Sequence, residues 1–382
     1  MSLTADFIKV ADATVGRGLC LLLAPFGAGA RDELSDPPPR RVLVIRPGGI
    51  GDAVLFIPML RALRTAWPDA ELDLLAERRN ASVVEPTGLV DRVYRYDRFP
   101  FDLIAIVRRR YDVVIDTEQF HCLSAIVAWM TRAPRRIGFG TTLRRRLFTR
   151  AVGYNLQTYE AEMFLALARA ATGSECRWDP DAPFYPLPDD AKRFARHALA
   201  SLAPSQKVAI HPGASIPERR WPPERYARLA QLLAEHGVGV VVLGGATDVA
   251  AAETIATGLV GSAFVNLAGR CSLVQAAAVV AECDMYISAD SGVLHLAYAL
   301  GTPTVHLFGP GVLSKWGPPG HRFRSIAAQV PCSPCTTYGY TPPCCQGMIC
   351  MLNITPEAVF AAVQSQLSTL DATSPLRRAE AP

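Results

Sequence analysis

The chain has 382 residues, half of them hydrophobic and 19% charged, and its formal net charge is +4. This composition excludes a disordered or fibrous chain and predicts a foldable globular protein. At about 150 residues per domain, the length predicts two domains with extensions. No apolar run reaches about 18 residues, so the sequence predicts no membrane-spanning helix.

Residues 1–39 form an N-terminal extension that ends in three consecutive prolines. Its apolar side chains include Phe7, Ile8, Val15 and the run 19–24, and charged residues interrupt them. Because of these charges we do not interpret the segment as a signal peptide. The amphipathic pattern fits two alternatives, a helix on a membrane surface or a helix packed against the fold.

Strand-like and helix-like segments alternate from Arg41 onward. We predict strands at 42–45, 71–76, 92–96 and 111–116, and a helix at 53–66. Such alternation is typical of a parallel, doubly wound sheet. Residues 40–180 are therefore predicted to be a Rossmann-like domain.

A proline-rich stretch, residues 181–206, flanks one helical segment and is interpreted as an interdomain linker. The alternation then restarts. Predicted strands lie at 207–210, 238–243, 266–268, 284–288 and 303–308, and predicted helices lie at 223–236, 272–282 and 291–300. Residues 207–330 thus form a second Rossmann-like domain, followed by a Cys-rich segment, a helix and a tail over 331–382.

A glycine-rich turn follows the first predicted strand. Gly48, Gly49 and Gly51 allow a sharp turn, and they place Asp52 in the first turn of the next helix, at the carboxyl edge of the sheet. The order of residues is not the dinucleotide fingerprint G-x-G-x-x-G. A carboxylate repels phosphate, so Asp52 is interpreted as a helix cap or as a general base toward a hydroxyl group.

Two loops of the second domain suit an anionic ligand. The first contains His211, Gly213 and Ser215, and the arginines Arg219 and Arg220 that follow can hold a diphosphate. The alternative for Arg219 is a solvated turn.

The other loop runs from strand 284–288 into the helix at 291–300. Asp290 and Ser291 are typical N-cap residues, and backbone N–H groups at Ser291 and Gly292 suit a pyrophosphate. His295, one turn further on, is either part of this site or a packed helix histidine.

Another glycine turn, in the second domain, contains Asp248. Its carboxylate either caps the following helix or meets a ribose.

Five of the ten cysteines lie within nineteen residues. Cys332 and Cys335 have the spacing of a zinc knuckle, but the remaining cysteines lack a second matching pair. We predict no metal, with zinc on Cys332, Cys335, Cys344 and Cys350 as the alternative. The other cysteines are scattered, as expected in a reducing compartment.

Arginine is dense at 108–110, 135–136 and 144–146, all in the first half of the chain. This asymmetry indicates an anionic partner on one face, or else solvated helix faces and turns.

Taken in order, these motifs resemble glycosyltransferase family 9, the lipopolysaccharide heptosyltransferases of the GT-B fold. The resemblance rests on G-G-I-G-D at 48–52, H-P-G-A-S at 211–215, R-R-W-P at 219–222 and D-S-G-V-L-H-L-A at 290–297 with F-G-P at 308–310. It implies two Rossmann-like domains facing across a cleft. Several relatives have a lysine before the W-P pair, where this chain has Arg219 and Arg220, which keep the charge.

The resemblance implies Asp52 as the base acting on the acceptor, and Asp290, Ser291 and Gly292 as ligands of the nucleotide sugar. The function we predict is inverting transfer of a heptose or related sugar from an ADP-activated donor, such as ADP-heptose, to a lipopolysaccharide-core or other lipid-linked saccharide. No cofactor is expected, and the enzyme would be cytoplasmic and peripheral on the inner membrane face. Alternatives are another nucleotide sugar, a non-catalytic sugar-nucleotide-binding protein, or a nicotinamide-dependent oxidoreductase, which the absence of G-x-G-x-x-G disfavours.

Overall fold

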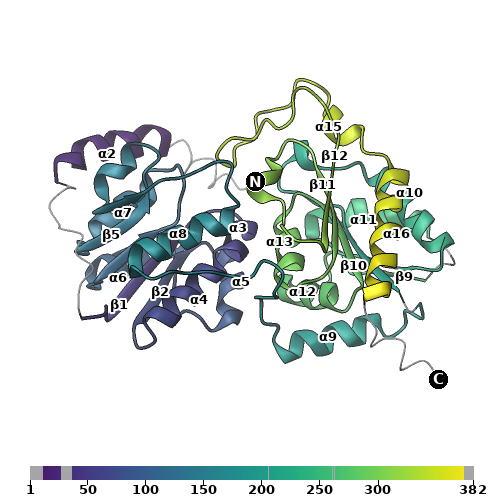
Figure 1. Cartoon of the computed structure of the whole chain (residues 1–382), viewed down its shortest axis with the longest axis horizontal. Coiled ribbons are helices and arrows are strands. Elements are labelled where there is room, and N and C mark those ends of the chain that lie inside the picture. Colours follow the sequence, from purple (N-terminus) through teal and green to yellow (C-terminus); the bar gives the residue numbers. More distant parts are fainter. Residues whose placement is uncertain (1–11, 27–36, 205, 260, 262, 374–382) are drawn as a thin grey trace. The chain divides into compact units, whose positions relative to one another are not determined.

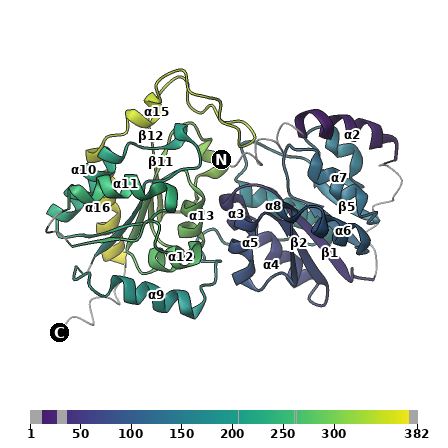
Figure 2. The same ribbon diagram turned by 180° about the vertical axis from the view of Figure 1, so that it is seen from behind.

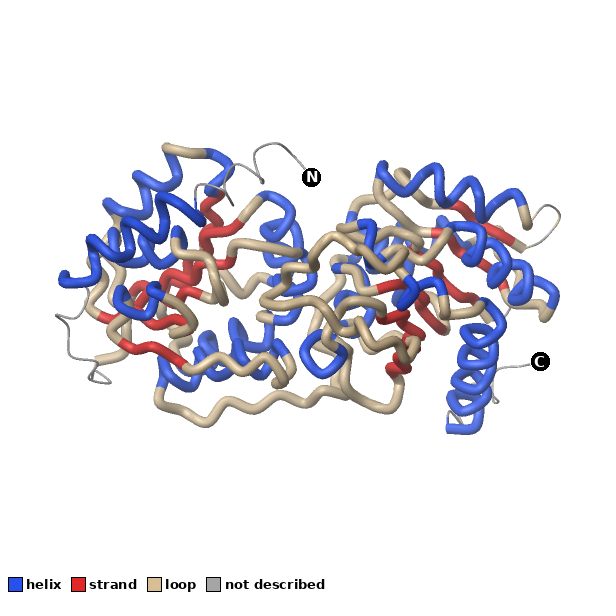
Figure 3. The backbone as a smooth tube through the Cα atoms, turned by 90° about the horizontal axis from the view of Figure 1, so that it is seen from above, coloured by secondary structure: helices blue, strands red, loops and turns tan. Residues whose placement is uncertain are grey.

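The computed structural model describes residues 12–26, 37–204, 206–259, 261 and 263–373. The chain divides into two compact units, residues 1–179 and 180–382. Each unit contains one six-stranded parallel sheet with helices on both faces (Figures 1 and 3). Among the described residues, no helix has both the length and the apolar character needed to cross a membrane.

The sheet of the first unit has the strand order β3-β2-β1-β4-β5-β6. Its strands are β1 Arg41–Arg46, β2 Glu71–Ala76, β3 Arg92–Arg95, β4 Val113–Asp116, β5 Arg135–Phe139 and β6 Arg150–Val152. The strand order reverses between β1 and β4, which are direct neighbours. The loops after these two strands therefore meet at a topological switch point, where open α/β sheets bind ligands.

Helices of the first unit cover both faces of its sheet. They are η1 Asp12–Gly16, α2 Arg17–Leu23, η2 Ala24–Phe26, α3 Ile50–Leu55, α4 Ile57–Ala66, α5 Arg78–Val84, η3 Glu85–Thr87, η4 Tyr96–Arg98, α6 Phe101–Arg108, α7 Leu123–Met130, η5 Leu143–Leu147 and α8 Glu160–Thr172. Helices α3, α4, α5 and α8 pack together, and α2, α6 and α7 contribute to the core on the other face.

The second unit repeats this topology, with the order β12-β11-β10-β7-β8-β9. Its strands are β7 Lys207–His211, β8 Gly239–Val242, β9 Phe264–Asn266, β10 Met285–Ala289, β11 Thr304–Phe308 and β12 Phe323–Ala327. The switch point here lies between β7 and β10. Strands β8, β10 and β11 are fully buried, and β7 is buried except at Lys207, as expected for a parallel sheet covered on both faces.

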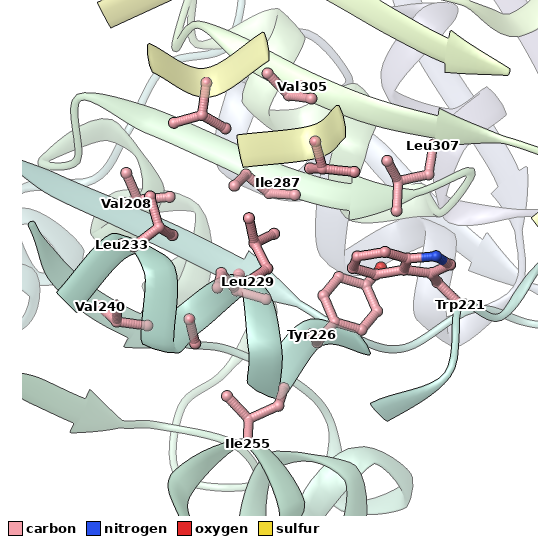
Figure 4. Packing of buried hydrophobic residues seen from close by; sticks show 14 of the residues in the cluster. Val208, Trp221, Tyr226, Leu229, Leu233, Val240, Ile255, Ile287, Val305 and Leu307 are labelled. Atoms are coloured by element: carbon pink, nitrogen blue, oxygen red, sulfur yellow. The ribbon is translucent and has the colours of Figure 1, made fainter. Parts of the chain in front are cut away.

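Two helical layers enclose the second sheet. Its helices are α9 Asp189–Leu199, η6 Pro217–Arg219, α10 Pro223–Glu235, η7 Ala246–Asp248, α11 Val249–Thr257, α12 Leu273–Ala281, α13 Gly292–Ala299, α14 Leu313–Trp316, α15 Ile349–Leu352 and α16 Pro356–Thr373. One core layer holds α10, α11 and α16, and the other holds α9, α12 and α13. Figure 4 shows Trp221 against Tyr226 in the first layer, where the Trp221 indole N–H donates to the Ile354 carbonyl at 3.0 Å.

The fold class predicted from the sequence, two doubly wound parallel sheets, is confirmed. Three strands, β5, β6 and β12, were not predicted, and the predicted helix 53–66 is broken at Phe56 into α3 and α4. Within the predicted linker 181–206, helix α9 packs on α12 as part of the second unit. Residues 12–26 of the predicted extension pack within the first unit, and its remaining apolar residues before Asp12 lie outside the described residues.

Candidate active site

Asp52 lies in the first turn of α3, directly after β1 and the glycine turn. The Arg46 guanidinium donates to its carboxylate at 2.9 Å, with the Arg46 side chain 1% exposed and that of Asp52 24% exposed. The same guanidinium donates to the Thr117 carbonyl beyond β4 at 2.9 Å. Arg46 therefore connects the two strand ends at the switch point of the first unit.

Glu118 and Asp116 add two buried carboxyl groups at the end of β4. Glu118 accepts backbone N–H bonds from Gln119 and Phe120, both at 3.0 Å. Burial opposes ionisation of Glu118, but the charges of Arg46 and its other neighbours outweigh it, so the pKa of Glu118 is lowered. A second carboxylate therefore stays ionised near Arg46.

Arg144 is the counter-ion of Asp116, at 2.5 Å, and neither side chain is exposed. Burial raises the pKa of Asp116 although Arg144 opposes this shift. The pair fixes η5 against the end of β4. Arg46 itself has a raised pKa because the carboxylates of Asp52, Glu118 and Glu160 outweigh its burial.

The first residues of α8 complete this polar cluster. Glu160 is fully buried and accepts hydrogen bonds from the Gln119 amide at 2.6 Å and the Tyr154 hydroxyl at 2.8 Å. Burial, followed by the charge of Glu160, raises the pKa of Tyr154, so this phenol stays protonated as a donor. Sequence reasoning missed Arg46, Glu118 and Glu160, although Glu118 could have been found because it follows the strand that a doubly wound sheet places beside β1.

In the second unit, His211 at the end of β7 connects two of the predicted loops. Its Nε2 lies 3.5 Å from the Asp248 carboxylate, and its Nδ1 lies 3.5 Å from the Ser291 hydroxyl. Asp248 also accepts the Gly245 backbone N–H at 2.8 Å. Burial opposes ionisation of Asp248, but these partners outweigh it and lower its pKa. Asp248 thus caps the turn that contains η7 and is held against His211.

Arg219 and Asp290 form the other connection between predicted loops. Arg219 Nη1 lies 3.1 Å from Asp290 Oδ2, and both side chains are largely buried, 16% and 5% exposed. Ser291 occupies the N-cap position of α13 without a side-chain capping bond. The first N–H groups of a helix have no intrahelical partner, so the start of α13 presents donors beside a fixed guanidinium.

Two glycines are required by close approach of these groups. Gly48 has φ +112°, and a Cβ there would lie 2.8 Å from the Arg46 guanidinium. A Cβ at Gly213 would lie 2.5 Å from the Asp248 carboxylate. Both positions exclude larger residues because the neighbouring ion pair would be displaced.

The remaining residues predicted for the two sites differ in how far their side chains are exposed to solvent. Ser215 and Arg220 are exposed, and Arg220 donates to the Ala214 carbonyl at 3.3 Å. His295 is buried in α13, and its charge is a secondary cause, after burial, of the lowered pKa of His306. Gly49 is the N-cap of α3, Gly51 lies in the first turn of α3, and Gly292 is the first residue of α13.

The four cysteines of the zinc alternative line one small cavity of about 110 Å³, together with Cys345 and Glu218. Among the described residues, no group of three or more His, Cys, Asp or Glu side chains is arranged so that it could hold a metal ion.

The predicted basic surface is partly wrong. Arg135, Arg136 and Arg144 are buried, whereas Arg145 and Arg146 are exposed. The buried guanidinium groups donate to partners inside the first unit and are not available to an anionic partner.

Each sheet thus gathers its functional groups at its own switch point. The first unit offers a carboxylate held by an arginine, which suits proton removal from a hydroxyl group. The second offers an arginine and helix N–H donors, which suit a diphosphate.

Comparison with known proteins agrees with this arrangement. Residues 102–344 match the model of glycosyltransferase family 9 (heptosyltransferase). Lipooligosaccharide heptosyltransferase 2 of Haemophilus ducreyi is 27% identical over 300 residues, covering 71% of this chain and 83% of that protein. Lipopolysaccharide heptosyltransferase 2 of Escherichia coli K12 is 26% identical over 311 residues, covering 75% and 87%.

Solved structures show the same fold. The structure of E. coli ADP-heptose LPS heptosyltransferase II matches with a TM-score of 0.70 and 25% identity, over 87% of this chain and 99% of that one. An E. coli heptosyltransferase with ADP matches with a TM-score of 0.66 at 20% identity, over 86% and 98%.

Two doubly wound sheets in one chain, with these structural matches, define an enzyme of the GT-B class of glycosyltransferases. The chain belongs to glycosyltransferase family 9. The matched range begins at Asp102, so the loop that carries Asp52 lies before it.

Proposed function

We propose that the enzyme is an inverting heptosyltransferase. It moves a heptose, or a related sugar, from an ADP-activated donor to a lipopolysaccharide-core or other lipid-linked saccharide. The proposal is supported by the family match and by the names of the relatives, which are heptosyltransferases that act in lipopolysaccharide or lipooligosaccharide synthesis. The observation that carries it is the location of complementary groups at the two switch points, Asp52 in one unit and Arg219 with the start of α13 in the other.

Asp52 is the proposed general base. It takes the proton of the acceptor hydroxyl as the oxygen attacks the anomeric carbon and the bond to the diphosphate breaks. Base catalysis of this kind contributes roughly a hundred- to ten-thousand-fold. Arg46 holds the carboxylate in place and favours its ionised form, which is the form able to accept the proton.

The second unit is the proposed donor site. Negative charge grows on the diphosphate as it leaves, and Arg219 and the first-turn N–H groups of α13 stabilise it. His211, Asp248 and Ser291 fix the loops around this site through their mutual contacts. Gly213, Ser215, Arg220, Gly292 and His295 are proposed to line the same site.

No cofactor is proposed, because Arg219 and the helix start supply the positive charge that a metal would otherwise provide. Transfer activity is therefore expected to persist in excess EDTA, and its loss, with recovery on adding back a divalent metal, would contradict this point.

Because the proposed acceptor is lipid-linked, the enzyme is proposed to act at the inner face of the cytoplasmic membrane as a peripheral protein.

A panel of nucleotides tests the donor. Only a ligand that binds the native state raises the melting temperature, so ADP and ADP-heptose are expected to raise it more than UDP or GDP. Stabilisation by UDP alone would sink the heptose assignment. Nucleotide binding without sugar transfer to any lipid-linked acceptor would favour the non-catalytic alternative.

A further inference from the structure

The N-terminal segment 12–26 is anchored to the first unit by its inner side. The Asp12 carboxylate accepts the backbone N–H groups of Cys122 and Leu123, both at 2.7 Å, and so caps the start of α7. It also lies 3.1 Å from His121 Nδ1. Cys20 is fully buried beside Cys122. Helix α2 is therefore fixed in place beside α7 (Figures 1 and 2).

The outer side of the same segment is apolar and exposed. Val15 is 56% exposed, Leu19 36% and Leu22 71%, and these residues are three or four positions apart along the segment. The neighbouring Leu21 is also exposed, at 52%. Asp12 and Cys20 anchor the inner side of the segment, and a large part of the surface of Val15, Leu21 and Leu22 is left open to solvent.

Basic side chains border this apolar surface. Arg17 projects from α2 and is exposed, with its guanidinium 5.9 Å from the centre of the Phe120 ring. Arg145 and Arg146 of η5 are also exposed. They line an open groove of about 480 Å³ whose other walls are apolar, formed by Leu21, Ala24, Pro25 and Phe148.

We propose that this surface, which we call the α2 face, docks on a bilayer that contains anionic phospholipids. The α2 face comprises Val15, Leu19, Leu21, Leu22, Arg17, Arg145 and Arg146. The exposed leucines enter the boundary between headgroups and acyl chains, and the arginines contact lipid phosphates, with the groove between α2 and η5 large enough for a headgroup.

Charge complementarity selects this partner. An apolar helix side flanked by arginines is the pattern of interfacial helices, which combine buried apolar area with attraction to anionic lipids. Three arginines around exposed leucines leave the surface unsuited to a second copy of itself, because like charges would face each other. The inference locates the membrane association included in the proposed function, but it does not depend on the identity of the sugar.

Vesicle flotation with the full chain tests the proposal. Wild type is expected to float with vesicles that contain about one third phosphatidylglycerol and to stay behind with pure phosphatidylcholine, with binding weakened by salt. Arg145→Ala/Arg146→Ala is expected to bind roughly thirtyfold more weakly, from about 1 kcal/mol for each arginine. Leu22→Glu is expected to abolish binding.

Phe101→Glu is the matched control. Phe101 is 75% exposed on α6 of the same unit, so this change removes a similarly exposed apolar side chain outside the α2 face. The control is expected to bind like wild type, and all variants are expected to melt at the same temperature because the changed side chains are exposed.

Unchanged vesicle binding by both α2-face variants, or loss of binding by Phe101→Glu instead, would overturn the proposal. The proposal would also be overturned if no variant binds vesicles and the protein instead self-associates in a way that Leu22→Glu disrupts. Sugar transfer to a lipid-free acceptor is measured in parallel, and Leu22→Glu is expected to leave it unchanged. A failed docking proposal and a failed transferase proposal thus give different results.

Discussion

Arg46 is the residue through which the first unit controls its proposed base. Its guanidinium is almost fully buried, and it contacts Asp52 and the Thr117 carbonyl while lying 5.3 Å from the centre of the Phe164 ring. Removal of a buried arginine beside a carboxylate favours the protonated acid. Arg46 is thus a positioning residue that also sets the charge of the base.

Replacement of Arg46 by Gln should move the acid limb of the pH profile of kcat/KM to higher pH, because Asp52 is then protonated more easily. Arg46→Lys keeps the positive charge and is expected to recover most of the shift. The profile is measured for both variants and wild type at saturating donor. An acid limb at the same pH in Arg46→Gln would show that this arginine does not act on the base.

Arg219 is expected to act mainly on the departing diphosphate. Arg219→Ala should lower kcat by about a hundredfold and raise KM for the donor less strongly, because the interaction is strongest when the leaving group carries its full charge. Arg219→Lys should recover part of kcat, since it restores charge without the two-pronged geometry.

The matched variant for this experiment is Arg220→Ala. Arg220 is exposed and contacts a backbone carbonyl, whereas Arg219 pairs with buried Asp290. A loss of kcat in Arg220→Ala as large as that in Arg219→Ala would contradict the assignment of the leaving-group role to Arg219 rather than to Arg220.

Strand β11 carries a buried histidine that makes the stability of the second unit depend on pH. His306 lies between the hydroxyls of Thr304, 3.3 Å away, and Ser325, 2.5 Å away. Burial, followed by the charge of His295, lowers the pKa of His306 to about 3. Below the pKa of about 6.5 of an unfolded histidine, the unfolded chain binds a proton that the folded chain excludes.

The free energy of unfolding should therefore fall as the pH drops below about 6.5, by up to ~1.4 kcal/mol per pH unit from this group. His306→Gln should show a smaller decrease between pH 7 and pH 5. Urea unfolding of both proteins across this range measures the difference. Equal slopes would show that His306 takes up its proton at the same pH in the folded and the unfolded chain, so that its pKa is not lowered by folding.

Strand β5 shows why some elements escaped prediction. Its arginines, Arg135 and Arg136, resemble surface residues in sequence. In the structure they are buried because they donate to backbone carbonyls, Arg135 to that of Ala171 and Arg136 to those of Leu147 and Ala133. These acceptors are supplied by other elements, so no local pattern reveals them.

In the whole molecule, the alternation of apolar strands and amphipathic helices was sufficient to predict two parallel sheets, because parallel strands buried on both faces appear as apolar runs. The loops after the strands were predicted from the same pattern, because each loop begins where an apolar run ends. The ion pairs Arg46–Asp52 and Arg219–Asp290 were not, since they depend on the strand order and on side-chain directions. The strand order explains why the groups of each unit meet at its switch point.

Asp52 is the proposed base of a sugar transfer whose donor binds in the second unit. Asp52→Asn keeps the size of the side chain and removes its ability to accept a proton. We predict that this variant loses at least about a hundredfold in transfer from ADP-heptose to a lipid-linked acceptor while its affinity for ADP, measured by calorimetry, stays within about twofold of wild type. Transfer at the wild-type rate by Asp52→Asn would show that Asp52 is not the base.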